Sequence, residues 1–71
     1  MAEYNILYMT TKKQLSILKL KCQNIIDEIR RIRLLNEIDV LLKELDDKYS
    51  ENKYFDDIVI KVELLEHELE N

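Results

Sequence analysis

Residues 15–32 read LSILKLKCQNIIDEIRRI, and the spacing of their apolar side chains decides the fold class. Alternating steps of three and four residues place one set of side chains on a single helical face: Leu15, Leu18, Cys22, Ile25, Ile29 and Ile32. This alternation is the seam of a heptad repeat, which is typical of helices that pack against other helices. The phase slips after Ile32, so a kink or break near Asn36 stays open as an alternative.

The composition favours helices and opposes a sheet. The chain has 71 residues, of which 46% are hydrophobic and 37% charged, and it contains neither glycine nor proline. Tight turns between strands usually need Gly, Pro or Asn-Gly, and this sequence offers none of them. We therefore predict an all-α fold with a single domain over residues 1–71.

The pattern predicts two helices joined by a polar turn. Residues 11–14 match a capping box, so the first helix is expected over about residues 11–48, after a weakly ordered lead-in at 1–9. A polar cluster predicts a turn at about 49–52, and a second amphipathic helix follows over about 53–70. The expected architecture is an antiparallel helical hairpin with a long first helix.

Apolar side chains on the facing sides of these helices are expected to form the hairpin core. The predicted core residues are Ile38, Leu45, Phe55, Ile58, Val62, Leu65 and Leu69. Tyr49, Tyr54 and Phe55 bracket the turn, and two interpretations of them stay open. They lock the end of the hairpin, or they anchor a partner.

The unequal lengths of the two helices leave part of the seam uncovered. At 1.5 Å per residue the first helix would span roughly 57 Å and the second only roughly 27 Å. The side chains beyond the reach of the second helix are Leu15, Leu18, Cys22, Ile25 and Ile29. Burying each is worth about 1.5–3 kcal/mol, so we expect another protein chain or a second copy to bind this stripe.

Charge is divided unevenly along the chain, whose net charge is −4. Residues 1–35 carry seven basic and three acidic side chains, whereas residues 36–71 carry four basic and twelve acidic ones. Such asymmetry occurs in nucleic-acid arms and also in hairpins whose halves neutralise each other. The second interpretation is favoured, with Glu63, Glu66 and Glu70 expected near Arg30, Arg31 and Arg33.

No residue set has the spacing of a catalytic or metal site, so neither enzymatic activity nor a cofactor is expected. Glu63 and His67 lie four residues apart, but a solvated polar face is favoured over a metal pair. Cys22 lies on the seam and is expected to be a core residue. With no signal-peptide pattern and no apolar run near the ~20 residues of a membrane span, a cytoplasmic location away from membranes is expected.

Short motifs in both predicted helices are similar to those of a known family. They are Met9-Thr10-Thr11 before Leu15 and Leu18, and then Phe55, Ile58 and Leu65-Glu66. In these motifs residues 9–70 resemble the small E-type co-chaperones of type III secretion systems. The resemblance implies a cytoplasmic helical hairpin that acts with a larger helical-repeat chaperone to hold the needle subunit.

Two alternative functions stay open. One is a regulatory helical-hairpin dimer of the Rop type that binds RNA, although the net charge of −4 opposes general affinity for nucleic acid. Its candidate phosphate contacts are Lys12, Lys19, Arg30 and Arg33. The other is an inhibitor of a regulatory protein. Glu44-Leu45-Asp46 resembles the sporulation phosphatase hairpins, but Leu42 stands where that family has a serine.

Overall fold

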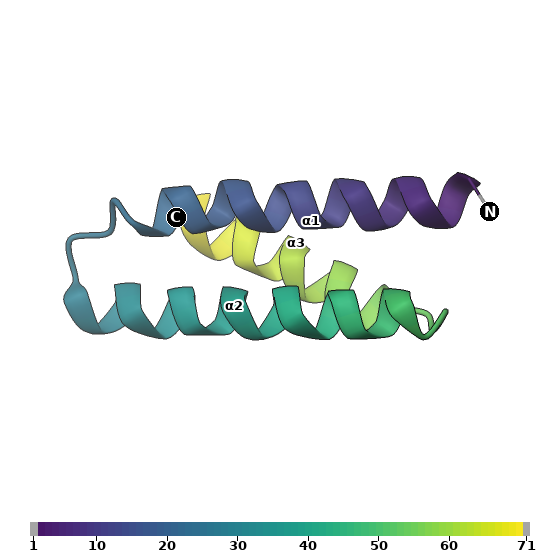
Figure 1. Cartoon of the computed structure of the whole chain (residues 1–71). Coiled ribbons are helices and arrows are strands. Elements are labelled where there is room, and N and C mark those ends of the chain that lie inside the picture. Colours follow the sequence, from purple (N-terminus) through teal and green to yellow (C-terminus); the bar gives the residue numbers. More distant parts are fainter. Residues whose placement is uncertain (1, 71) are drawn as a thin grey trace.

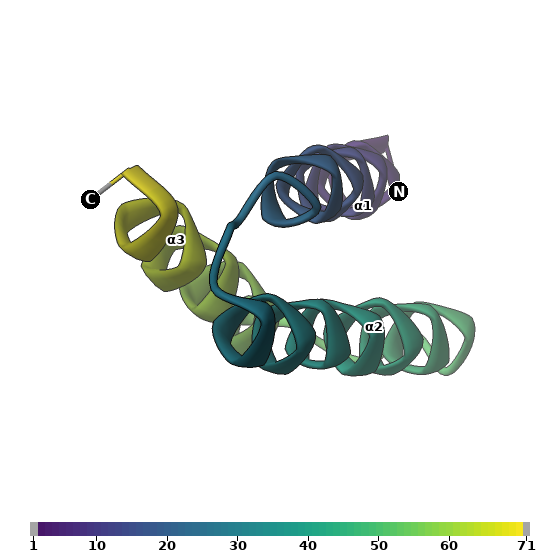
Figure 2. The ribbon, with the colours of Figure 1, turned by 90° about the vertical axis from the view of Figure 1, so that its left-hand side faces the viewer.

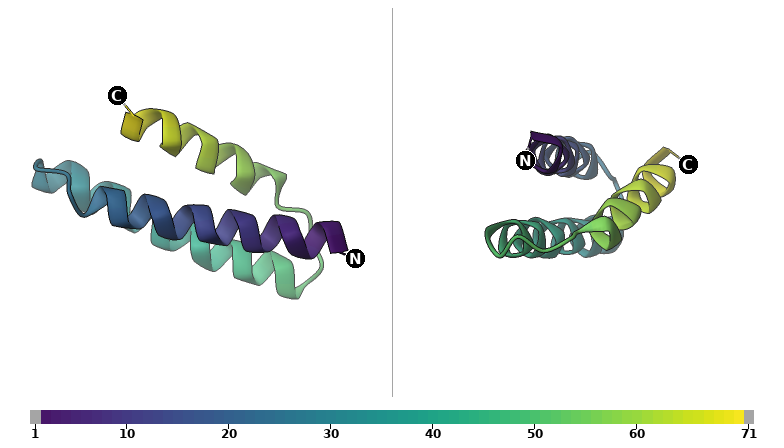
Figure 3. Two further views of the ribbon diagram at one scale, coloured as in Figure 1. Left: turned by 90° about the horizontal axis from the view of Figure 1, so that it is seen from above. Right: turned by 90° about the vertical axis from the view of Figure 1, so that its right-hand side faces the viewer.

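The computed structural model describes residues 2–70, which form three α-helices and no strand. Helix α1 spans Ala2–Cys22, α2 spans Glu28–Ser50 and α3 spans Asp56–Glu70. Helix α2 runs antiparallel to α1, and α3 returns in the direction of α1 (Figure 1). Seen from one end, α3 lies to one side of the α1–α2 pair (Figure 2), and the views in Figure 3 agree. The prediction of an all-α fold is confirmed for these residues.

The long helix predicted over residues 11–48 is divided into two helices. The chain leaves helical geometry after Cys22 and reverses between residues 23 and 27, before α2 begins. Asp27 caps α2, since its carboxylate accepts a hydrogen bond from the backbone N–H of Arg30 at 3.2 Å. Helix α2 then continues unbroken through Asn36, so the interruption comes about ten residues before the alternative position. Folding back shortens the bundle to 41 Å.

The N-terminal residues form the first turns of α1 and not the weakly ordered lead-in predicted for residues 1–9. The helix begins at Ala2, and Met1 lies outside the described residues. Thr11, predicted to cap the helix, is buried in its middle. There its Oγ1 donates a hydrogen bond to the carbonyl of Leu7 at 2.7 Å, which satisfies the hydroxyl within the helix.

A single apolar core lies between the three helices. Its buried members are Leu15, Leu18, Cys22, Leu34, Ile38, Leu41, Leu45, Phe55, Ile58, Val62 and Leu65. The spacing of these residues within each helix is three or four, so every helix turns one face inward. Helix α1 packs against both other helices, which contact each other less.

The turn predicted at about 49–52 connects α2 to α3, and α3 begins slightly later than expected. Asn52 has a φ of 57°, in the left-handed region. Its backbone N–H donates to the carbonyl of Tyr49 at 3.1 Å, and the N–H of Lys53 donates to the carbonyl of Lys48 at 2.8 Å. This pair of bonds is a Schellman motif, in which asparagine takes the place that glycine usually fills.

Leu18 and Leu20 provide a matched test of this packing, because one is fully buried and the other is exposed on the same helix. We expect Leu18→Ala to lower the free energy of unfolding by about 2–5 kcal/mol, through lost burial and the cavity left behind. Leu20→Ala should change it by less than about 0.5 kcal/mol. Urea unfolding followed by circular dichroism measures both values, and equal losses would contradict the assigned faces of α1.

The left-handed conformation of Asn52 predicts a specific order of stability. Asn52→Gly should be as stable as the wild type or slightly more stable, because glycine adopts φ > 0 without steric cost. Asn52→Val should lose at least about 1 kcal/mol, since a β-branched side chain clashes with the backbone in this region. Thermal unfolding would rank the three proteins, and a valine variant equal to wild type would refute the conformation.

Candidate protein-interaction surface

The stripe predicted to bind a partner is largely covered within the chain. Leu15, Leu18 and Cys22 are fully buried in the core that α1 shares with α2 and α3. Ile25 is half-buried at the edge of this core, and Ile29 alone is well exposed, at 81%. Only a continuous first helix would leave this stripe uncovered. Because the chain reverses after Cys22, α2 and α3 cover the inner face of α1.

The side chains predicted to form the hairpin core lie in the three-helix core. Those that are buried are Ile38, Leu45, Phe55, Ile58, Val62 and Leu65, and Leu69 is half-buried against them. They share this core with α1, so the pairing of α2 with α3 is supported by a third helix from the same chain.

Two of the three aromatic side chains near the α2–α3 turn hold that end of the bundle together. Tyr49 stacks on Tyr8 with ring centroids 3.8 Å apart, and the buried Phe55 lies 5.3 Å from the ring of Tyr4. Tyr54 is exposed. Tyr49 and Phe55 therefore lock the helix ends, and their partners come from the N-terminal segment that was expected to be weakly ordered.

Hydrogen bonds fix the same end of α1 to α2. The hydroxyl of Tyr8 donates to the carboxylate of Asp46 at 2.6 Å, and the ammonium of Lys12 reaches that carboxylate at 3.2 Å. These two interactions, the hydrogen bond from Tyr8 first, lower the pKa of Asp46. The hydroxyl of Tyr49 donates in turn to the side-chain oxygen of Asn5 at 2.6 Å. The first half of α1 is thus held in a fixed orientation.

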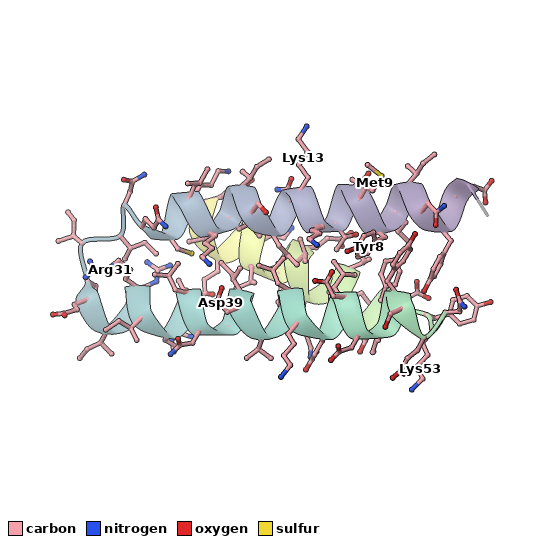
Figure 4. All side chains as sticks on the ribbon, viewed as in Figure 1. Tyr8, Met9, Lys13, Arg31, Asp39 and Lys53 are labelled. Carbon is pink, nitrogen blue, oxygen red and sulfur yellow. The ribbon has the colours of Figure 1, made fainter. Side chains whose placement is uncertain are left out.

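Apolar side chains also line the face of α1 that points away from α2 and α3. We call this set the outer stripe of α1: Ile6, Met9, Ile17 and Leu20, with Lys13 at the centre. Ile6, Met9 and Leu20 are 62%, 67% and 63% exposed, and Ile17 is 36% exposed. Figure 4 shows Met9 and Lys13 extending away from α2, whereas Tyr8 points towards it. An aligned row of exposed apolar side chains is a typical mark of an interaction surface.

Other exposed apolar side chains occur at the α1–α2 turn, on α2 and on α3. Ile26 is 97% exposed in the turn, close in sequence to Ile29 in the first turn of α2. Ile60 and Leu64 are exposed one helical turn apart on α3. Ile29, Ile32 and Val40 are exposed along one face of α2, over residues 29–40. The outer stripe, over residues 6–20, is the longest of these rows within one helix.

The outer stripe lies in a segment without carboxylates. Residues 4–26 contain four lysines and no Asp or Glu, although the whole chain is acidic. Lys12 and Lys19 form ion pairs with Asp46 and Asp39 of α2, at 3.2 and 2.9 Å. Within the described part of the chain, Lys13 and Lys21 form no ion pair. Their positive charge remains available at the surface.

At α3 the opposite charges of the two chain halves meet through two of the predicted arginines, but at Glu68 in place of the predicted Glu63, Glu66 and Glu70. Arg33 pairs with the carboxylate of Glu68 at 3.3 Å, and Arg30 donates to the backbone carbonyl of Glu68 at 3.1 Å. Arg31 instead donates to the carbonyl of Ile25 at 2.8 Å, within the α1–α2 turn. Each exposed pair contributes at most about 1 kcal/mol, so these contacts orient α3 more than they stabilise the fold.

Across residues 2–70, no three or more His, Cys, Asp or Glu side chains are grouped so that they can hold a metal ion. Cys22 is buried in the core, and this burial raises the pKa of its thiol. A buried thiol with a raised pKa is a poor nucleophile.

Comparison with known proteins adds no identification. No protein-family model matches the chain, and neither the curated proteins nor the solved structures contain a significant match. None of the helices between residues 2 and 70 has the length and apolar character to span a membrane. The surface of the bundle is therefore the basis for inferring function.

The hydrogen bonds of Asp46 predict how stability depends on pH. Because the folded-state pKa lies below the unfolded value of about 3.9, the ionised group stabilises the fold above that value. This contribution is lost as the pH falls through the folded pKa. We expect Asp46→Asn to be less stable than the wild type near pH 6, with the difference shrinking towards about pH 2. Urea midpoints across this range measure it.

Tyr8→Phe is the companion variant, because it removes the main hydrogen bond to Asp46 and keeps the aromatic ring. It should show the same shrinking difference from the wild type at low pH. A stability deficit of Asp46→Asn that stays constant from about pH 6 to about pH 2 would contradict the assigned ionisation.

Proposed function

We propose that this chain is a small interaction module that binds another protein through apolar side chains that its own fold leaves exposed. The outer stripe of α1 carries this proposal. Single exposed apolar residues are normal on any protein, but four on one helical face over about four turns, with Lys13 between the two pairs, form an extended contact surface. The rigid attachment of α1 to α2 presents this surface without an ordering cost at the time of binding.

Within this class, we propose that the chain acts as a co-chaperone in the cytoplasm. The resemblance to the E-type co-chaperones of type III secretion names the partners, a helical-repeat chaperone and the needle subunit. Such a chaperone offers grooves between helices, and these suit an amphipathic helix as the bound element. The helical fold is consistent with this role, although it has one helix more than the hairpin that the resemblance implies.

Side-chain contacts favour a protein partner over RNA. Of the four candidate phosphate contacts, Lys12, Lys19 and Arg33 are paired with carboxylates of the same chain. Arg30 donates to the backbone of Glu68. Binding RNA through these groups would require breaking each contact and bringing phosphates towards the paired acids.

The inhibitor alternative depends on Glu44-Leu45-Asp46, and two of these residues are committed to the bundle. Leu45 is fully buried, and Asp46 is bound to Tyr8 and Lys12. Only Glu44 keeps a side chain that is not engaged in this way. This motif therefore offers little surface for recognition. The proposed function remains that of a co-chaperone that binds another protein chain.

Affinity purification from the native cell tests the proposal, with mass spectrometry and nucleic-acid staining of the eluate. We expect a protein in stoichiometric amount that, when purified, raises the thermal midpoint of the chain by mass action. The complex should survive about 0.5 M salt, where RNA bound through phosphates would be released. Recovery of a helical-repeat protein and a needle-sized subunit would support the co-chaperone role. A chain that binds only RNA would refute the proposed function.

A further inference from the structure

The outer stripe of α1 is symmetric in sequence about Lys13. Met9 and Ile17 lie four residues to either side of Lys13, and Ile6 and Leu20 lie seven residues to either side. A helix lying antiparallel on this face would meet the same pattern of side chains from either end. This symmetry raises the question of whether the occupant is a second copy of the chain or a different helix.

Charge argues against a second copy. In a two-fold antiparallel pair of α1 helices, Lys13 would face its own symmetry mate at the axis. The remaining surface of both helices is also mainly basic, since α1 carries four lysines and a single carboxylate, Glu3, in its first turn. Like charges placed opposite each other in an interface cost free energy and suppress that pairing.

The same charges favour an acidic partner. Lys13 stands in the middle of the apolar row, and Lys21 follows near its end. The alkyl part of a lysine can pack on an apolar neighbour while its ammonium reaches out to a carboxylate. A helix with an apolar stripe flanked by Asp and Glu would therefore bury the stripe and pair with both lysines.

We propose that the outer stripe of α1 binds an acidic amphipathic helix of a partner protein, laid along α1 with a carboxylate against Lys13. This inference rests on the proposed function, because it names the chemistry of the partner. The stripe from Ile6 to Leu20 is roughly 21 Å long, which corresponds to about four turns of the bound helix. Apolar contacts supply most of the affinity, and the carboxylates select the partner.

Two synthetic amphipathic peptides of about 18 residues test the charge requirement. They share one leucine stripe, and the flanking positions are Glu in one peptide and Lys in the other. Fluorescence anisotropy with the full chain, at about 0.15 M salt, gives both dissociation constants. We expect the Glu peptide to bind at least about tenfold more tightly.

Variants of the outer stripe identify the surface. Lys13→Glu should reverse the preference between the two peptides, and Leu20→Asp should abolish binding of both. Both positions are exposed, so neither change disturbs the core. The matched controls are Lys61→Glu on α3 and Val40→Asp on α2, which are exposed away from α1 and should bind the Glu peptide as the wild type does. Circular dichroism checks that each variant is folded.

Several outcomes would overturn the inference. Equal affinity for the two peptides, or no change in preference with Lys13→Glu, would refute the acidic partner. A dimer in sedimentation experiments that Leu20→Asp dissociates would assign the stripe to a second copy. If Ile26→Asp abolishes binding of the natural partner and Leu20→Asp does not, the partner binds at the α1–α2 turn. That last result would leave the proposed function standing.

Discussion

The packing of α1 onto α2 and α3 is the interaction on which the other features depend. It buries Leu15, Leu18 and Cys22 of α1. These side chains would be exposed to water if only α2 and α3 packed together. Three such side chains represent several kcal/mol, a large part of the stability available to a domain of this size. The same packing determines the outer surface, because a helix that turns one apolar face inward presents its opposite face to solvent.

Chain reversal without glycine or proline constrains how this packing is reached. At the α2–α3 turn, Asn52 takes the left-handed conformation and completes a Schellman motif. At the α1–α2 turn, Asp27 caps the next helix, and the guanidinium of Arg31 binds the carbonyl of Ile25. Backbone groups are thus satisfied by backbone hydrogen bonds at the α2–α3 turn and by polar side chains at the α1–α2 turn. The absence of glycine therefore does not prevent a three-helix bundle.

The sequence was sufficient for the helical class and the inward faces, because a period of three and four residues records which side of a helix is buried. It was insufficient for the first turn. Cys22, Ile25 and Ile29 keep the heptad spacing across the residues where the chain reverses, so the period alone cannot distinguish a turn from a continuous helix. The detectable signal was local, since Asn24 and Asp27 both favour turns and helix caps.

The chain reversal after Cys22 also changes which face of α1 is exposed for interaction. A continuous helix would have needed a partner to cover Leu15 and Leu18, whereas a reversing chain covers them itself. The tyrosines at the start of α1 could not be assigned from their spacing, since their contacts lie on residues more than 35 positions away. The outer stripe can be recognised in the sequence only once the structure shows which face of α1 is buried in the core.

The division of charge follows from the same arrangement of helices. Ion pairs from Lys12 and Lys19 to α2, and from Arg33 to α3, neutralise part of the opposite charge of the two chain halves at the surface of the bundle. Lys13 takes no part, because it extends away from α2 and forms no ion pair with the described residues. A positive charge in the centre of an apolar row therefore remains unneutralised by the fold. In the proposed complex a carboxylate of the partner complements that charge, so the geometry that completes the core also leaves the lysine accessible on the outer face.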